Sequence, residues 1–173
     1  ESSPAFLSDP HYLFYSCEPK TSREVKVVLQ SSGSTPIYSG FKVTHIYSKI
    51  TQEVLPVSFG VRAPRVSPDQ QRVIYESNTD GNLELYLLDF DGVDLRHIDS
   101  NAIGPRRITR NEVDDGNPYF FPDGKRIVFV SARERIHQLY AADIDGSKEQ
   151  HLNPNQYDCY SPVISPDGKT IAF

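Results

Sequence analysis

Short apolar runs separated by turn residues recur along the whole chain. The clearest example spans 117–131, where the apolar stretch Tyr119–Phe121 precedes the turn Pro122–Lys125 and the alternating run Arg126–Ser131. Proline presets the first corner of such a turn, and glycine takes positive φ without a steric penalty. The pattern predicts two antiparallel strands joined by a tight turn, with Ile127 and Phe129 on one face of the second strand.

The same phrase occurs four times and aligns without a gap on Pro4, Pro64, Pro118 and Pro162. These prolines are 60, 54 and 44 residues apart. The shortest spacing falls within the roughly 40–50-residue period of propeller blades, so the third copy serves as the model unit. This internal repeat predicts that each copy is one supersecondary unit.

The third copy predicts four strands. Pro118 stands at the first residue of the opening strand, a position where proline is tolerated. The second strand is Arg126–Ser131, the third is Gln138–Asp143, and a short polar fourth strand covers Glu149–Leu152. Four antiparallel strands with tight turns make one propeller blade.

The second copy follows the same plan, with strands predicted at Arg72–Glu76 and Glu84–Asp89. Its fourth strand is either Leu95–Ile98 or Arg106–Thr109. The latter is favoured because it leads directly into the next opening strand. In the more divergent first copy, Tyr12–Ser16 and Val25–Leu29 fit the second and third strands, and Phe41–Tyr47 and Val54–Phe59 also have the composition of strands.

The predicted fold class is all-β: a β-propeller of four-stranded antiparallel blades, with about three and a half blades present. Residues 1–173 form one partial propeller domain, with blade 1 at about 3–60, blade 2 at about 61–115, blade 3 at about 116–159 and half of blade 4 at about 160–173. Propellers close on themselves to protect their edges. We therefore expect a ring of six to eight blades, completed by further blades or by another chain.

The composition narrows the classes of partner. The chain has 18 basic and 23 acidic residues, a net charge of −5, and no basic run of the kind that binds nucleic acid. No apolar run approaches the roughly 20 residues of a membrane span, so membrane insertion is not expected. The chain begins at Glu1 and contains no Met, which predicts a processed or excised start.

No motif for catalysis, metal binding or cofactor binding is present. There is no GxSxG elbow, HExxH, GxGxxG after a strand, or phosphate-binding loop. We predict no catalytic residue, no metal site and no cofactor, and edge or surface positions for the five histidines, which are His11, His45, His97, His137 and His151.

The two cysteines, Cys17 and Cys159, are expected three blades apart on one face of the ring. Such a separation greatly exceeds the roughly 7 Å between Cα atoms that a disulfide allows. Two free thiols, or pairing outside this chain, are therefore predicted.

The recurring turn residues are interpreted as structural. An aspartate in a Pro-Asp-Gly turn accepts hydrogen bonds from the backbone of its own turn. This interpretation covers Asp69, Asp123, Gly124, Asp167 and Gly168.

Two further aspartates, Asp89 and Asp143, close the third strands and are predicted to tether one blade to the next. Arg133 is the expected partner of one of them.

Functional candidates lie where the copies differ. The loops that enter first strands and the hairpins between second and third strands share one face, which we name the mouth face. Loops on a rigid scaffold are the usual binding surface. The candidate binding residues in its channel-mouth loops are Glu112, Asp114, Asp115, Tyr157 and Asp158. Their acidic and aromatic character fits a basic peptide or a cation.

The repeat resembles the TolB-like β-propeller family, whose blades carry a WD-like repeat. The residues that carry the resemblance are FFPDGKRIVFVS and QLYAADIDG in the third copy and ISPDGKTIAF in the fourth. The second copy departs from the pattern with Gln70 in place of glycine, and the first keeps only Asp9. Members similar to TolB are periplasmic, non-enzymatic proteins that bind other proteins, so the resemblance implies a scaffold in the periplasm or outside the cell.

Two other functions are compatible with the same blades. One is the substrate-gating propeller of a prolyl-oligopeptidase-like serine hydrolase whose catalytic domain lies outside this chain. The other is a structural propeller subunit of a large complex. Fold alone does not separate these functions.

Overall fold

The structure is a computed structural model of the 173-residue chain. It describes the backbone of strand residues 25–31, 39–45 and 51–55, and it describes residues 61–69, 71–91, 93, 103–133, 135–152 and 157–173 in full. The chain divides into two compact units. One comprises residues 1–61 and 90–104, and the other comprises 62–89 and 105–173.

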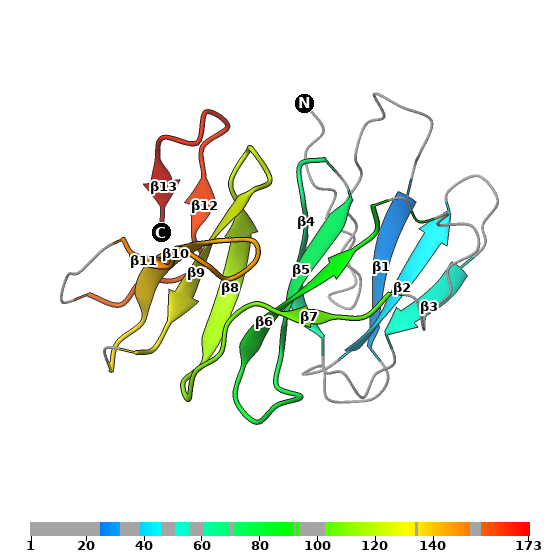
Figure 1. Ribbon diagram of the computed structural model, residues 1–173, viewed down its shortest axis with the longest axis horizontal. Coiled ribbons are helices and arrows are strands. Elements are labelled where there is room, and N and C mark those ends of the chain that lie inside the picture. The colour runs from blue at the N-terminus through cyan, green and yellow to red at the C-terminus, as the bar shows by residue number, and fades with distance from the viewer. Residues whose placement is uncertain are drawn as a thin grey trace. The chain divides into compact units, whose positions relative to one another are not determined.

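The first unit contains a three-stranded antiparallel sheet of order β1-β2-β3 (Figure 1). Its strands are β1 (Val25–Ser31), β2 (Ser39–His45) and β3 (Thr51–Leu55). The first two overlap the strands predicted from the sequence. The third begins three residues earlier than the predicted Val54–Phe59, so that boundary was wrong. The predicted strand at Tyr12–Ser16 lies outside the described residues.

The second unit begins with a four-stranded antiparallel sheet of order β4-β5-β6-β7, which we name blade 2. Its strands are β4 (Arg62–Val66), β5 (Arg72–Ser77), β6 (Glu84–Asp89) and β7 (Arg106–Arg107). The short β7 pairs with β6, which confirms the choice of the later fourth strand. The alternative at Leu95–Ile98 lies outside the described residues.

Blade 3 repeats this sheet in the order β8-β9-β10-β11. Its strands are β8 (Asp115–Phe120), β9 (Arg126–Ser131), β10 (Gln138–Asp143) and β11 (Gln150–His151). A hairpin of β12 (Val163–Ile164) and β13 (Ile171–Ala172) opens blade 4. These sheets confirm the all-β fold built from four-stranded antiparallel blades (Figure 1).

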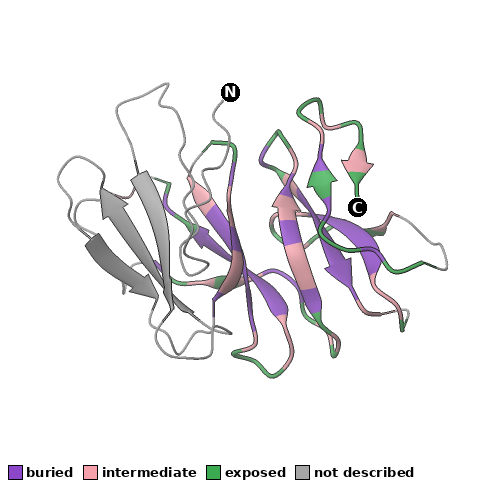
Figure 2. Cartoon of the chain, turned by 180° about the vertical axis from the view of Figure 1, so that it is seen from behind, coloured by how far each residue is buried: buried purple, intermediate pink, exposed green. Residues whose placement is uncertain are grey.

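The apolar core lies between successive blades. Ile127 and Phe129 of β9 belong to a cluster with Ile74, Leu85 and Leu87 of blade 2. The alternate residues of β9, which are Val128 and Val130, belong to a second cluster with Ile164 of the blade 4 hairpin. Side chains alternate across a strand, so a blade buries both faces only when it has a neighbour on each side. Figure 2 shows the middle strands in the purple of buried residues.

The opening segments of blades 2, 3 and 4 have the same irregularity before their prolines. Ala63, Asn117 and Ser161 precede Pro64, Pro118 and Pro162, and their φ angles are 42°, 51° and 47°. In β4 and β8 the pairing register shifts at this point. Proline lacks the N–H of a regular ladder and is tolerated at a bulge. The prediction that Pro118 begins its strand was therefore wrong, because β8 begins three residues earlier and bends at this site.

The Pro-Asp-Gly turns have the geometry of tight reversals. Gly124 has φ of 66°, and its N–H donates to the Phe121 carbonyl oxygen at 2.9 Å. Asp123 Oδ1 accepts a hydrogen bond from Lys125 N at 2.9 Å, and Asp167 Oδ1 accepts one from Lys169 N at 3.1 Å. These contacts stay within each turn, as expected of structural residues.

Successive turns also pack against one another. A Cβ on Gly124 would lie 3.7 Å from Pro68 Cδ of the preceding turn, and a Cβ on Gly168 would lie 3.5 Å from Pro122 Cδ. A side chain at either glycine would therefore meet the neighbouring turn as well as the strain of positive φ. Among the residues described, the structure has no helical segment with the length and apolar character of a bilayer crossing.

Candidate functional site

Within the second unit, the described residues of the mouth face lie in four segments at one end of the sheets: 78–83, 109–114, 132–137 without residue 134, and 157–161. Asp115 pairs with Ser131 across β8 and β9, so the loop entering β8 and the hairpin leaving β9 lie at the same end. The loops therefore meet where one blade joins the next, at the lower ends of β8 and β9 in Figure 1.

A carboxylate joins blade 3 to blade 2, and an equivalent carboxylate joins the blade 4 hairpin to blade 3. Asp114 Oδ1 accepts a hydrogen bond from the backbone N–H of Leu83 in blade 2 at 2.8 Å. Asp158 Oδ1 accepts the equivalent bond from His137 N in blade 3 at 2.7 Å. Both aspartates stand four residues before the proline of their copy. Both aspartates therefore make the same structural contact, although both remain exposed to solvent.

A backbone bond accompanies each carboxylate. Asp115 N donates to the Leu83 carbonyl oxygen at 2.8 Å, and Cys159 N donates to the His137 carbonyl oxygen at 2.7 Å. We name each pair of bonds, one from the aspartate and one from the next backbone N–H, a staple. The staples fix where the mouth loops start.

Asp115 is not an accessible binding residue, which corrects the sequence prediction. Its side chain is fully buried at the start of β8. Arg133 Nη2 lies 3.0 Å from Asp115 Oδ2, and Asn111 Nδ2 donates to the same oxygen at 2.7 Å. Burial raises the pKa of Asp115, and these partners offset part of the rise. Asp115 therefore serves the fold of blade 3.

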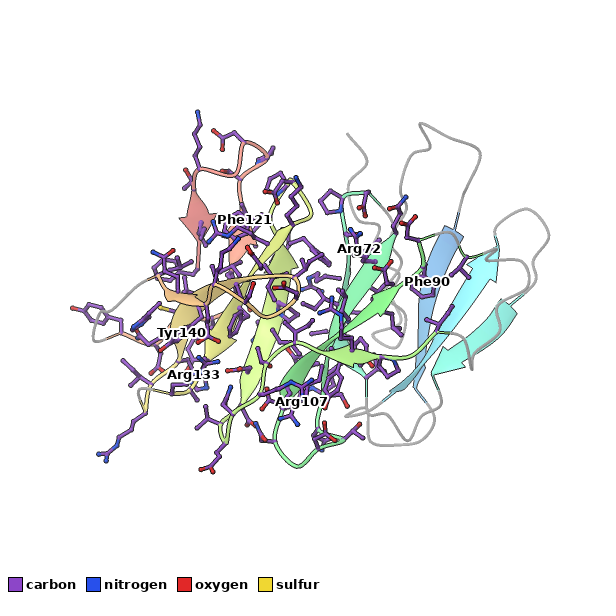
Figure 3. The ribbon with its side chains drawn as sticks, in the orientation of Figure 1. Arg72, Phe90, Arg107, Phe121, Arg133 and Tyr140 are labelled. Atoms are coloured by element: carbon purple, nitrogen blue, oxygen red, sulfur yellow. The ribbon has the colours of Figure 1, made fainter. Side chains whose placement is uncertain are left out.

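Arg133 links this buried carboxylate to the outer part of its blade. It also pairs with Glu149, and its guanidinium carbon lies 4.7 Å from the centroid of the Tyr140 ring. Figure 3 shows Arg133 and Tyr140 close together on blade 3. The expected pairing of Arg133 with a third-strand aspartate was wrong.

The third-strand aspartates pair within their own blades. Asp89 Oδ2 accepts from Arg72 Nε at 3.1 Å, and Asp143 Oδ2 lies 2.8 Å from Lys148 Nζ. Arg72 and Lys148 belong to the same blades as Asp89 and Asp143. The prediction that Asp143 tethers its blade to a neighbour is therefore replaced by a contact within blade 3, and the tether at Asp89 stays a prediction.

A buried polar position at the start of each third strand was missed from the sequence. In blade 2 it is Glu84, whose Oε1 accepts from Arg107 Nη2 at 2.8 Å and from Asn111 N at 2.9 Å. In blade 3 it is Gln138, which donates to the Tyr157 carbonyl oxygen at 2.8 Å. Both residues stand twenty positions after the proline of their copy, and this recurrence was the available signal.

Two exposed aromatic side chains of the mouth face lie at the entry to β12. Tyr157 is 77% exposed and Tyr160 is 53% exposed. Tyr160 was missed from the sequence, and its ring centroid lies 5.0 Å from that of His137. Glu112, another predicted binding residue, is exposed in the loop before β8.

Asp158 lies between the two tyrosines in sequence and remains partly exposed. Its pKa is held below the ordinary value, first by the hydrogen bond from the His137 backbone and then by the His137 side chain, whose Nδ1 lies 3.0 Å from Oδ1. The carboxylate is therefore ionised at neutral pH. It supplies a negative charge beside exposed aromatic rings.

Two further described residues, Cys159 and His151, make structural contacts. Cys159 forms no disulfide with a described residue, and its buried thiol donates to the Tyr157 carbonyl oxygen at 3.7 Å. Cys17 lies outside the described residues. His151 stacks on Tyr140 with ring centroids 4.6 Å apart. Within the described ranges, no three His, Cys, Asp or Glu residues are placed to hold a metal ion.

The chain matches the family model of the TolB beta propeller domain over residues 20–173. This match confirms the resemblance drawn from the repeated Pro-Asp-Gly phrase. The chain is similar to TolB from Acinetobacter baumannii, whose crystal structure superposes with a TM-score of 0.64 at 22% identity, covering 86% of this chain and 34% of that one. At this identity the superposition shows the fold alone.

Two curated relatives have different descriptions. The uncharacterized protein Atu1656 of Agrobacterium fabrum is 29% identical over 108 residues, which are 62% of this chain and 33% of that protein. The uncharacterized peptidase YuxL of Bacillus subtilis is 27% identical over 124 residues, which are 70% of this chain and 18% of that protein. The chain thus spans a third or less of the length of each of these relatives.

Proposed function

Because the chain belongs to the TolB β-propeller domain family, we propose that it is a non-catalytic recognition module that binds a protein or peptide through its mouth face. The observation that carries this proposal is a contrast between backbone and side chains. The staples that join blade 2 to blade 3 and blade 3 to the blade 4 hairpin are the same, but the loops that they hold differ in sequence and exposure. Fixed loops bind with a small entropic cost, because little ordering is required on binding.

The mouth face has the chemistry of a polar recognition surface. Exposed tyrosines combine an apolar ring with a hydrogen-bonding hydroxyl, and they are enriched at protein interfaces. Tyr157 and Tyr160 are such residues, and Glu112 and Asp158 supply negative charge. The same face also carries the exposed Arg110 and Arg135. The partner we propose is a peptide whose basic residues pair with Glu112 and Asp158. The location we propose is periplasmic or secreted, and it rests on the likeness to TolB.

Selection from a random peptide library on the intact protein tests the proposal. The mouth-face variant combines Glu112→Lys with Tyr157→Ser, and the control variant combines Lys125→Glu with Lys169→Glu on the Pro-Asp-Gly turns at the opposite end of the sheets. We expect selected peptides to bind the parent and the control equally and to bind the mouth-face variant at least about tenfold more weakly. Equal binding to all three proteins would overturn the assignment of this face.

A second candidate function is the propeller of a serine peptidase, with catalysis by a domain outside this chain. The similarity to the peptidase YuxL favours it. Treatment of the intact protein with a fluorophosphonate probe separates the candidates, since only an activated serine nucleophile is labelled. Labelling that is abolished by prior denaturation would support the peptidase. The recognition module alone predicts no labelling.

A further inference from the structure

The contacts between consecutive blades provide an internal comparison. Junction 2/3 is the meeting of blades 2 and 3 at the mouth face, and junction 3/4 is the meeting of blade 3 with the blade 4 hairpin. Both contain a staple with nearly equal distances: 2.8 and 2.8 Å in junction 2/3, and 2.7 and 2.7 Å in junction 3/4. Differences between the junctions therefore lie in side chains carried by the same frame.

At three equivalent positions, junction 2/3 has an aliphatic residue or glycine and junction 3/4 has an aromatic residue or histidine. Counted from the proline of each copy, the positions occupied by Leu83, Val113 and Gly116 in junction 2/3 hold His137, Tyr157 and Tyr160 in junction 3/4. The fold does not require these rings, because junction 2/3 forms its staple without them. Their exposure makes them available to a partner.

The absence of a side chain at Gly116 has a local cause. A Cβ at Gly116 would lie 3.0 Å from Glu76 Oε1, which also accepts a hydrogen bond from Asn117 N at 2.6 Å. In the next blade, Val130 occupies the position equivalent to Glu76 and has no such carboxylate. The position of Tyr160 is therefore relieved of that constraint.

The loop that bears the tyrosines is held on blade 3. The Tyr157 carbonyl oxygen accepts from Gln138 Nε2 at 2.8 Å, and Cys159 N donates to the His137 carbonyl oxygen at 2.7 Å. Asp158 Oδ1 accepts from His137 N in the same stretch. Three consecutive residues are thus fixed by bonds to one blade, as a preorganised site requires.

We propose that Tyr157, Asp158 and Tyr160 form a recognition site for an arginine side chain of the bound peptide. A guanidinium stacks on aromatic faces and pairs with a carboxylate. The site offers two exposed rings and one ionised, partly exposed carboxylate, which is also contacted by the side chains of His137 and Tyr160. The inference rests on the proposed function, because it names the chemistry of the partner at the mouth face. Junction 2/3 has the equivalent carboxylate, Asp114, but no rings, and it serves as the control.

The test uses two small probes that differ in charge. N-acetyl-arginine methylamide carries a guanidinium, and N-acetyl-citrulline methylamide is its neutral isostere. Each is titrated into the intact protein, and the ring signals of ¹³C-labelled tyrosine are followed by NMR. We expect the arginine probe to shift the signals of Tyr157 and Tyr160 and to bind at least about fivefold more tightly than the citrulline probe.

Matched variants assign the effect to this site. Asp158→Asn retains an acceptor for the His137 N–H and removes the charge, so it should abolish the preference for arginine. Asp114→Asn makes the same change at junction 2/3 and should leave the preference intact. Tyr160→Leu should weaken binding of the arginine probe while the circular dichroism spectrum stays that of the parent.

Equal binding of the two probes, or equal effects of Asp158→Asn and Asp114→Asn, would overturn the inference. If library peptides still bound the mouth face in that case, the proposed function would stand with a different partner chemistry. If no peptide bound the mouth face, the proposed function itself would fail. The library selection and the probe titration thus separate the two failures.

Discussion

Junctions 2/3 and 3/4 use the same staple but differ in what surrounds it. In junction 2/3 the residue after the staple aspartate is the buried Asp115, which is paired with Arg133. In junction 3/4 the equivalent residue is Cys159, which is buried and uncharged, and the neighbouring tyrosines are exposed. Junction 2/3 thus has a buried charged side chain, Asp115, whereas junction 3/4 has exposed tyrosines beside an uncharged buried residue.

This difference distinguishes the recurring contacts that join the blades, which we name the frame, from the exposed side chains around them. A contact that recurs at the same offset in successive copies, such as the one made by Asp114 and Asp158, belongs to the frame. A side chain that changes from copy to copy and stays exposed is available for recognition. The repeat therefore supplies its own control for distinguishing the two roles.

The largest difference between the junctions should appear at the buried position after the staple aspartate. Asp115→Ala leaves Arg133 without its buried partner, and breaking such a pair costs about 3–5 kcal/mol of unfolding free energy. Cys159→Ala removes only a small apolar group and should cost about 1 kcal/mol. Guanidinium unfolding of the protein measures both, and equal losses would show that the ion pair does not distinguish the junctions.

Blades 2 and 3 also have a close backbone contact outside the mouth face. A Cβ on Gly146 would lie 2.5 Å from the Ile108 carbonyl oxygen, and Gly146 has φ of 87°. Gly146→Ala must displace backbone in the neighbouring blade and should cost about 3 kcal/mol.

Gly81→Ala is the matched control for this clash. Gly81 also has positive φ, 117°, but nothing lies within 4 Å of its Cβ position. Only backbone strain remains, and we expect a loss of about 1–2 kcal/mol. If the two alanine variants unfolded at the same denaturant concentration, the contact with Ile108 would contribute nothing.

The staples themselves should be energetically alike. Asp114→Ala and Asp158→Ala each remove a carboxylate that accepts one backbone N–H. We expect small decreases in Tm, slightly larger for Asp158→Ala because it also loses the contact with the His137 side chain, and each less than half of the decrease for Asp115→Ala. Differential scanning calorimetry measures these shifts. A markedly larger decrease for either variant would contradict the equivalence of the staples.

The smallest expected effect is on the pH dependence of stability. The folded-state pKa of Asp115 is raised, so protonation of Asp115 favours the folded state, and this contribution is lost as the pH rises through that pKa. The lowered pKa of Asp158 has the opposite sign: its contribution is present above the ordinary carboxyl pKa and is lost as the pH falls through the folded-state value.

Asp115→Asn should therefore lose stability more steeply than the parent as the pH falls from 7 toward about 4. Asp158→Asn should lose it less steeply below about pH 4. Urea unfolding across this range measures both slopes. Parallel curves for the parent and Asp115→Asn would contradict the raised pKa.

The sequence predicted most strands because their signals are local. Apolar alternation and the Pro-Asp-Gly turn fixed β9 at Arg126–Ser131 and β10 at Gln138–Asp143, as the structure has them. The bulge before each proline was not predicted, although Ala63, Asn117 and Ser161 recur at one offset. Because three different residue types occupy that position, nothing in the sequence indicated that all three have a positive φ angle.

The candidate site was predicted less completely. Tyr157 and Asp158 were found because they interrupt the repeat in an entering loop. Asp115 was misplaced because a run of acidic residues before Gly116 has the composition of an exposed loop. Val61 and Cys159 occupy its position in the second and fourth copies, and their apolar character was a signal that the position is buried, although the first copy has Glu1 there.

The sequence by itself determined the repeat, the strand order within each blade and the turn residues, since these depend on neighbours a few positions away. Only the tertiary structure decided which carboxylate is buried, which joins two blades and which faces solvent. The physical reason is distance along the chain: the partners of Asp114 and Asp158 are 31 and 21 residues away. A polar side chain takes its role from the residues that folding brings beside it.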